Sequence, residues 1–134
     1  LFRSKEKNIT IHQQIAEQIQ VMGNQSLFEK ALHNIISNAV RHSPINSNIY
    51  VTLSTQELII KNEGITIPDN DLDKIFTPFY RVEKSHNKLT GGSGLGLYLV
   101  KNILEQHHFP YQIKNEDNSV CFKITINSQK LNQN

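Results

Sequence analysis

The stretch Thr90-Gly91-Gly92-Ser93-Gly94-Leu95-Gly96-Leu97-Tyr98-Leu99-Val100 places four glycines within six positions and then continues as an apolar helical pattern. Glycine at the start of a helix lets backbone N–H groups approach a ligand closely, and the helix dipole is positive at that end. Together these features suit an anion such as phosphate. Alone the run is ambiguous, because glycine loops also form plain turns.

Three common nucleotide motifs do not fit this stretch. A dinucleotide fingerprint requires a strand directly before the glycines, whereas residues 81–90 are polar and charged. A P-loop requires Gly-Lys-Ser/Thr after the glycines, and here Gly96 is followed by Leu97. The protein-kinase set is also missing, since the sequence contains no His-Arg-Asp and no Asp-Phe-Gly. A different nucleotide-binding fold is therefore required.

The composition predicts one domain, residues 1–134, with a single core at about residues 8–126 and a polar tail at 127–134. A net charge of +2 is too small to favour a nucleic acid or membrane-surface partner. The single cysteine allows no internal disulfide and favours a cytoplasmic setting. No apolar run approaches the roughly 18 residues of a membrane span. Because the chain begins at Leu1, we expect a fragment of a larger protein.

Apolar spacing predicts a helix from Ser26 to about His42, with Ser26 and Glu29 forming a capping box. Ser43-Pro44 is expected to end this helix. Strands are predicted at about residues 8–15, centred on residues 9–11, and at about 49–53, 57–62, 111–114 and 120–126. Further helices are predicted at about 69–75 and 95–106. The order predicts an α+β fold, a two-layer sandwich with helices packed on one face of a mixed sheet.

Two asparagines form a polar strip on the first helix. Asn34 and Asn38 lie one turn apart, and Arg41 follows on the same side. The amide oxygen of Asn38 is a suitable ligand for Mg²⁺, and Arg41 can neutralise phosphate charge. For this helix taken alone, a solvated polar face is the slightly favoured interpretation.

Two more motifs lie between this helix and the glycines. In Lys61-Asn62-Glu63-Gly64-Ile65-Thr66-Ile67-Pro68 a predicted strand ends in a loop, and Phe76-Thr77-Pro78-Phe79-Tyr80-Arg81 groups aromatic residues around a proline. Phe76 and Phe79 are expected to close the core over the end of the short helix.

Taken in order, these motifs resemble the catalytic ATP-binding domain of bacterial sensor histidine kinases. The wider family includes type II topoisomerases, heat-shock chaperone ATPases and mismatch-repair ATPases, and the resemblance implies their Bergerat-type fold. It covers about residues 8–126. Residues 84–87 and 92–101 look closest to kinases of Gram-positive bacteria, including vancomycin-resistance sensors.

The resemblance implies a role for each matching residue. Asn38 would coordinate Mg²⁺, Asn34 and Arg41 would lie beside the phosphates, and His42 would lie near the adenine. Related ATPases carry a water-activating glutamate where this chain has Asn34, which cannot act as a base; this favours phosphoryl transfer over hydrolysis. The implied catalytic residues are Asn34, Arg41 and Arg81.

The strand-end motif departs from the family pattern at two positions. Asn62 replaces an aspartate that accepts a hydrogen bond from the adenine amino group. An amide oxygen accepts a weaker bond than a carboxylate, and the added donors would loosen base selectivity. Thr66 replaces a glycine, and because a β-branched residue tolerates positive φ poorly, the loop must follow a different path there.

The remaining implied contacts fall on the loop before the glycines and on the glycine turn. Arg81, Lys84 or Lys88 would clamp the γ-phosphate, and backbone N–H groups from Gly92 to Leu97 would hold the triphosphate. The implied ATP-binding residues are Asn34, Asn38, Arg41, His42, Asn62, Gly64, Ile67, Phe79, Tyr80, Arg81, Lys88, Gly92, Ser93, Gly94, Leu95, Gly96 and Leu97.

The implied function is transfer of the γ-phosphate of Mg-ATP to a histidine on a separate, upstream dimerisation domain of the same kinase. A response regulator would be a partner of the full-length protein. We expect a cytoplasmic domain of a membrane sensor kinase that contacts neither nucleic acid nor membrane itself. A degenerate, non-catalytic nucleotide-sensing or protein-interaction module is the alternative, supported by Asn62 and Thr66. An anti-sigma-factor serine kinase is less favoured, because of the aromatic cluster.

Overall fold

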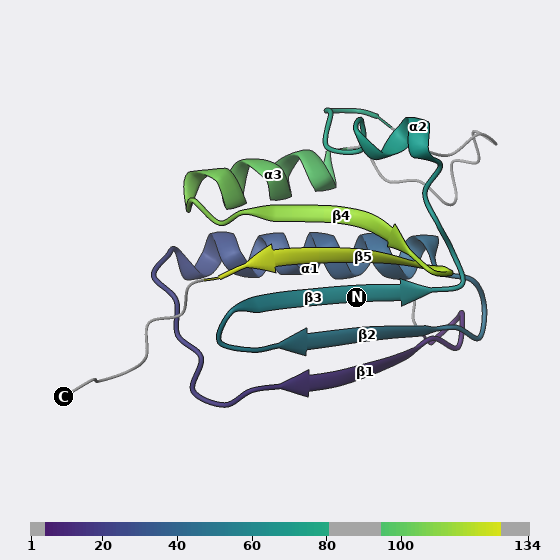
Figure 1. Cartoon of the computed structure of the whole chain (residues 1–134), viewed down its shortest axis with the longest axis horizontal. Helices are drawn as coiled ribbons and strands as arrows, with labels where there is room; N and C mark the ends of the chain where they lie inside the picture. Colours follow the sequence, from purple (N-terminus) through teal and green to yellow (C-terminus); the bar gives the residue numbers. More distant parts are fainter. Residues whose placement is uncertain (1–4, 81–94, 127–134) are drawn as a thin grey trace.

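The computed structural model describes residues 5–80 and 95–126, and the remaining residues lie outside the described part. Within these ranges the chain forms two layers, a five-stranded sheet and helices against one of its faces (Figure 1). The elements are β1 (Thr10–Ile15), α1 (Gln25–His42), β2 (Asn48–Leu53), β3 (Glu57–Glu63), α2 (Asp69–Leu72), α3 (Gly96–Gln106), β4 (Tyr111–Glu116) and β5 (Ser119–Thr125). The predicted α+β sandwich is confirmed.

The sheet is mixed, with strand order β1-β2-β3-β5-β4. β1 and β2 are parallel and are joined through α1, whereas every other neighbouring pair is antiparallel. β2 and β3 form one hairpin and β4 and β5 form the other, as the sequence predicts. β3 lies at the centre of the sheet, because it pairs with β2 on one side and with β5 on the other.

The start of α1 differs from the prediction. Asn24 is the N-cap, and its side-chain oxygen accepts a hydrogen bond from the N–H of Leu27 at 3.0 Å. The capping box predicted for Ser26 is wrong, since Ser26 lies inside the helix and Glu29 instead accepts from the amide of Gln25 at 3.1 Å. Asparagine caps a helix about as well as serine does, so Asn24 can fill this role.

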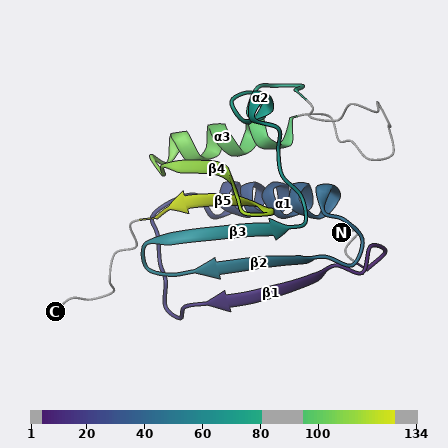
Figure 2. The same cartoon turned by 45° about the vertical axis from the view of Figure 1, so that its right-hand side comes forward.

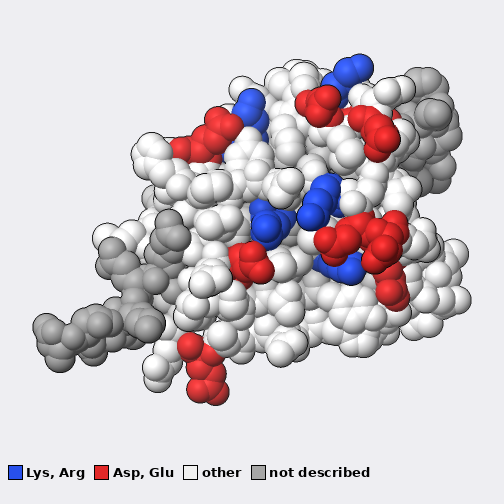
Figure 3. Space-filling model, in the orientation of Figure 1, with Lys and Arg blue, Asp and Glu red and all other residues white. Residues whose placement is uncertain are grey.

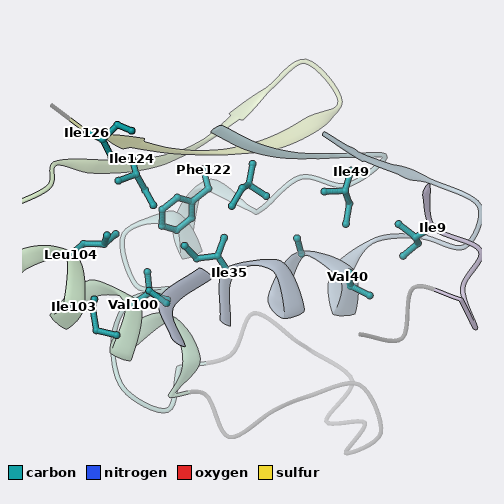
Figure 4. Packing of buried hydrophobic residues seen from close by; sticks show 13 residues of the cluster. Ile9, Ile35, Val40, Ile49, Val100, Ile103, Leu104, Phe122, Ile124 and Ile126 are labelled. Atoms are coloured by element: carbon teal, nitrogen blue, oxygen red, sulfur yellow. The ribbon is translucent and has the colours of Figure 1, made fainter. Parts of the chain in front are cut away.

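The core lies between the sheet and the two long helices (Figure 4). Alternate residues of the central strands face the helices, so Val51, Ile60 and Phe122 lie side by side in register. Helix residues with less than a tenth of their surface exposed complete the cluster: Ala31, Ile35, Ala39 and Val40 of α1, and Val100, Ile103 and Leu104 of α3. Each large buried side chain contributes about 1.5–3 kcal/mol, so this cluster dominates the stability of the fold.

The opposite face of the sheet carries charged residues (Figure 3). The Nζ atoms of Lys61 and Lys114 each lie 3.6 Å from a carboxylate oxygen of Glu116. Exposed ion pairs of this kind add little stability. Cys121, on the same face, is nevertheless buried, and desolvation raises the pKa of its thiol. No helix in the described ranges is long and apolar enough to span a membrane.

A close approach fixes the start of α1 against the end of α3. A Cβ on Gly23 would lie 2.5 Å from the Phe28 ring and 2.8 Å from the His107 ring, so only glycine fits there. His107 accepts at Nε2 from the N–H of Asn24 at 3.0 Å, and its Nδ1 lies 2.7 Å from the carbonyl oxygen of Ile103. Since a carbonyl only accepts, His107 donates from Nδ1 in this arrangement.

The short helix is shorter than predicted. α2 ends at Leu72, and residues 73–76 continue as turns rather than as helix to residue 75. Aspartate and asparagine, which fill most of this segment, are poor helix formers in a helix interior.

Candidate functional site

Three elements converge at one end of the molecule. The last turns of α1, the end of β3 and the start of α3 lie toward the same end in both views (Figures 1 and 2). α2 lies at this end too, above the sheet edge. α2 carries none of the site residues predicted from the sequence, whereas α1, β3 and α3 carry seven: Asn34, Asn38, Arg41, His42, Asn62, Gly96 and Leu97.

The amide strip of α1 faces the beginning of α3. A Cβ built on Gly96 would lie 3.9 Å from Oδ1 of Asn34, so glycine keeps the space between the two helices open. Asn38 lies one turn further along α1 and is half-buried. Within residues 5–80 and 95–126, neither amide side chain is engaged in a hydrogen bond. The amide oxygens of both side chains are hard donors of the kind that suits Mg²⁺.

Asn62 lies at the end of β3 and is 6% exposed. Its Nδ2 donates a long hydrogen bond of 3.4 Å to Oγ of Ser43, the residue that ends α1. The Ser43 hydroxyl in turn donates to the carbonyl oxygen of Ala39 at 2.7 Å. The sequence indicated Ser43 only as a helix end, and its contact with Asn62 was not predicted.

The loop after β3 turns at Gly64. Gly64 has φ +87°, and a Cβ there would lie 3.2 Å from the ring of Pro44. The N–H of Gly64 donates to the carbonyl oxygen of Asn118 at 2.7 Å. Thr66 does not have a left-handed backbone, so its β-branched side chain is tolerated as the prediction of a different path requires.

Asn115 of β4 holds the loop at Ile67. Its Oδ1 accepts from the N–H of Ile67 at 2.8 Å, and its Nδ2 donates to the carbonyl oxygen of the same residue at 2.7 Å. A single side chain therefore satisfies both backbone groups of Ile67. Asn115 was missed by the sequence reasoning, although a polar residue on the helix-facing side of a strand was a possible signal.

Lys7 is a second residue that the sequence reasoning missed. Its ammonium group donates to the carbonyl oxygens of Val40, Arg41 and Ser43 at 3.1, 2.6 and 3.0 Å. A cation at this position adds donors to the carbonyls at a helix C-terminus and matches the negative end of its dipole. Lys7 therefore fixes the turn that carries Arg41 and His42, both half-buried.

The aromatic cluster divides into two parts. Phe76 packs edge-on against Tyr111 and Phe122, with ring centroids at 5.1 and 5.9 Å, which confirms its predicted core role. The same prediction is wrong for Phe79, whose side chain is 69% exposed and whose φ is +67°. Phe76 already fills the space next to the core, so Phe79 remains available at the surface. Tyr80 donates to Asp71, and this bond raises the pKa of Tyr80.

A shallow groove lies apart from these residues, by the turns at the end of β3, and shares only Gly64 with the predicted ATP-binding set. It is lined by Pro44, Asn46, Ser47, Tyr50, Lys61, Glu63, Gly64, Asp117, Asn118 and Ser119.

Part of the predicted site lies outside the described residues. This applies to Arg81, Lys84 and Lys88 of the proposed clamp and to Gly92, Ser93 and Gly94 of the glycine turn. Their roles stay predictions. Of the remaining turn residues, Leu95 is 38% exposed, and the side chain of Leu97 packs against the core.

Comparison with known proteins places this geometry in a family. Residues 23–130 match the model of the histidine kinase-, DNA gyrase B- and HSP90-like ATPases. The chain is 37% identical over 110 residues to the probable sensor kinase SilS of Salmonella typhimurium, covering 79% of this chain and 22% of SilS. It is 33% identical over 110 residues to the sensor protein VanSB of Enterococcus faecalis, covering 79% of this chain and 25% of VanSB.

A solved structure extends the likeness to the whole fold. The catalytic domain of the histidine kinase ThkA, in a nucleotide-free form, superposes with a TM-score of 0.77 at 25% identity, covering 92% of this chain and 82% of that chain. The chain thus spans most of a catalytic domain but only about a quarter or less of the curated sensors it matches. The chain therefore belongs to the histidine kinase-, DNA gyrase B- and HSP90-like ATPase family, and within it to the catalytic domains of sensor histidine kinases.

Proposed function

We propose that this chain binds ATP together with Mg²⁺ and donates the γ-phosphate to a histidine on a separate, upstream dimerisation domain of the same kinase. The observation that carries this proposal is the facing of Asn34 on α1 and Gly96 at the start of α3. Amide oxygens on one side and a helix N-terminus on the other suit a metal-bound phosphate chain.

The residues at this end of the molecule fit the two ligands. Asn38 would hold Mg²⁺ through its amide oxygen, and Arg41 would neutralise phosphate charge. The N–H groups at the start of α3, together with those of Gly92 and Gly94, would hold the phosphate oxygens. Bound Mg²⁺ would supply charge neutralisation on the phosphates.

Catalysis by such a site depends on positioning rather than on a general base. Asn34 has no titratable group, so it cannot activate water for hydrolysis. Asn34, Arg41 and Arg81 would instead orient the γ-phosphate and balance its charge during transfer. His42 and Asn62 would lie at the base end of the nucleotide, near the loop that carries Gly64 and Ile67.

The proposal extends to the whole protein. Residues 1–134 would form one domain of a larger sensor kinase, on the cytoplasmic side of a membrane. ThkA has been solved in complex with the response regulator protein TrrA, and we propose a partner of the same kind here.

Isothermal titration calorimetry with a non-hydrolysable ATP analogue, with and without Mg²⁺, tests the site. Asn38→Ala is expected to reduce the Mg²⁺-dependent affinity by about tenfold or more, the equivalent of one lost charge-assisted interaction. Asn102→Ala removes an exposed amide on α3 and is the matched control, which should bind as the unsubstituted chain does. Equal losses in both variants would contradict the proposed metal site.

Two further outcomes bear on the enzyme class. A degenerate module would fail to bind Mg-ATP even as the Asn62→Asp variant, which restores the carboxylate of the family pattern. Because the chain lacks a His-Glu-x-x-x-Pro-like acceptor, it is expected not to label itself with radioactive ATP. Phosphate on His33 or His42 would contradict transfer to a separate domain.

A further inference from the structure

We propose that Ser43 orients the side-chain amide of Asn62, so that its oxygen faces the nucleotide base and selects adenine over guanine. This inference rests on the proposed nucleotide site and assigns Ser43 as a positioning residue within it. An aspartate at this position would present an acceptor oxygen in either orientation, whereas an amide has an acceptor end and a donor end. Only an amide therefore needs a partner that decides which end faces the ligand.

The hydrogen bonds of Ser43 decide that orientation. A hydroxyl has one hydrogen to donate, and that of Ser43 is directed to the carbonyl oxygen of Ala39 at 2.7 Å. Toward Asn62 it offers only lone pairs, so Nδ2 is the group that fits at 3.4 Å. The reversed amide would place two acceptor oxygens against each other between residues that are 2% and 6% exposed. Such an arrangement is unfavourable where no water competes.

The position of the hydroxyl is itself fixed. The N–H of Ser43 donates to the carbonyl oxygen of Val40 at 3.3 Å, and the carbonyl oxygen of Ser43 accepts from Lys7 at 3.0 Å. Backbone bonds on both sides therefore hold the residue that orients Asn62. If the hydroxyl turned to donate to Asn62, the carbonyl oxygen of Ala39 would lose its hydrogen bond from Ser43.

The other end of the amide is left for a ligand. Nδ2 is the only atom of the Asn62 side chain with a hydrogen bond in the described ranges, and no buried side-chain nitrogen or oxygen there lacks a partner. Oδ1 is therefore not sealed inside the protein. Adenine presents an amino group at its 6-position and guanine presents a carbonyl oxygen. Oδ1 can accept a hydrogen bond from the amino group of adenine, whereas it repels the carbonyl oxygen of guanine.

The ratio of ATP to GTP affinity tests this role of Ser43. Removing the hydroxyl in Ser43→Ala frees the amide to rotate and offer Nδ2 to guanine. We expect the ratio to fall about tenfold, the effect of one hydrogen bond gained or lost. Ser43→Thr keeps the hydroxyl and should retain the ratio. In the Asn62→Asp background both side-chain oxygens accept, so adding Ser43→Ala should leave the ratio unchanged.

Several outcomes would overturn the proposal. One is an unchanged ratio of ATP to GTP affinity in Ser43→Ala. Another is a fall in this ratio that is equally large when Ser43→Ala is added to Asn62→Asp, which would indicate a merely structural effect. Thermal unfolding identifies variants that fail to fold. The unsubstituted chain gives a test without variants: purine riboside triphosphate, which lacks the 6-amino group, should bind about tenfold more weakly than ATP. Equal binding would refute the role of Asn62, whereas no binding of ATP at all would refute the proposed function itself.

Discussion

Oδ1 of Asn34 on α1 lies 3.9 Å from the position that a Cβ would take on Gly96, the first residue of α3. This separation is an ordinary van der Waals contact. A methyl group therefore fits without displacing the amide, but it occupies the space between the two helices. Binding and folding consequently make opposite demands on Gly96.

Gly96→Ala is expected to separate these two demands. Alanine is a better helix former than glycine by about 1 kcal/mol, so stability in urea should be retained or increased. Affinity for Mg-ATP should fall, because the methyl group would lie where we propose that phosphate approaches the helix N-terminus. Calorimetry and urea unfolding measure the two quantities. A variant that loses stability and keeps its affinity would contradict the assigned site.

Gly23→Ala is expected to show the reverse pattern. Its Cβ would overlap the rings of Phe28 and His107, and overpacking of this kind destabilises by about 1–3 kcal/mol. Gly23 lies at the opposite end of α1 from Asn38, so the folded fraction should bind Mg-ATP with unchanged affinity. Urea unfolding together with calorimetry below the transition measures both effects.

Asn115→Asp tests the support of the loop at Ile67. The carboxylate keeps an acceptor for the N–H of Ile67 but loses the donor that satisfies its carbonyl oxygen. We expect a loss of about 1 kcal/mol in the free energy of unfolding, as for one hydrogen bond lost at a partly buried site. The matched control is Gln112→Glu, an exposed amide on the same strand, which should change stability little. Faster hydrogen exchange at the N–H of Ile67 in Asn115→Asp, but not in Gln112→Glu, would show that the loss of stability arises at this loop.

Lys7→Met removes the ammonium group and keeps most of the apolar stem. Three carbonyl oxygens at the end of α1 then lose a donor, and the helix dipole loses its countercharge. We expect destabilisation by about 1–2 kcal/mol in urea unfolding. Lys5→Met is the control, since Lys5 is exposed. Equal stability of the two variants would show that the Lys7 contacts contribute nothing.

Alkaline pH should reveal the environment of Tyr111. Burial, and then its hydrogen bond to Glu105, raises the pKa of Tyr111 from 10.0 to about 12. The neutral phenol is favoured in the folded chain, so this stabilisation is complete below pH 10 and is lost as pH rises through 12. The free energies of unfolding of the unsubstituted chain and of Tyr111→Phe, measured in urea, should therefore converge over this pH range. Curves that stay parallel would contradict the raised pKa.

The sequence predicted the features that depend on local patterns. The apolar periodicity of α1 and α3 and the alternation in the two hairpins predicted these helices and strands. The order of the helices and strands predicted the two layers. Asn34 and the start of α3 also meet as predicted. The helices and hairpins were predicted correctly because each depends on neighbours within one or two turns or strands, whereas the approach of Asn34 to the start of α3 followed from the family resemblance.

The remaining features depend on contacts between distant residues. Lys7 meets α1 more than thirty residues away, and Asn115 meets Ile67 from another strand. No local pattern encodes such pairs. The cap at Asn24 was missed because asparagine and serine cap helices about equally well. Phe76 contacts Phe122, whereas Phe79 is exposed, and both rings come from the same short segment of sequence.

The position of β3 also bears on how the chain acquires its structure. Its register with β2 is available as soon as the first hairpin has formed, but its other neighbour, β5, begins only at Ser119. During synthesis on the ribosome, the middle strand would keep one row of backbone groups open until β5 has emerged. Late closure of this kind slows folding and leaves a nascent chain open to association with others.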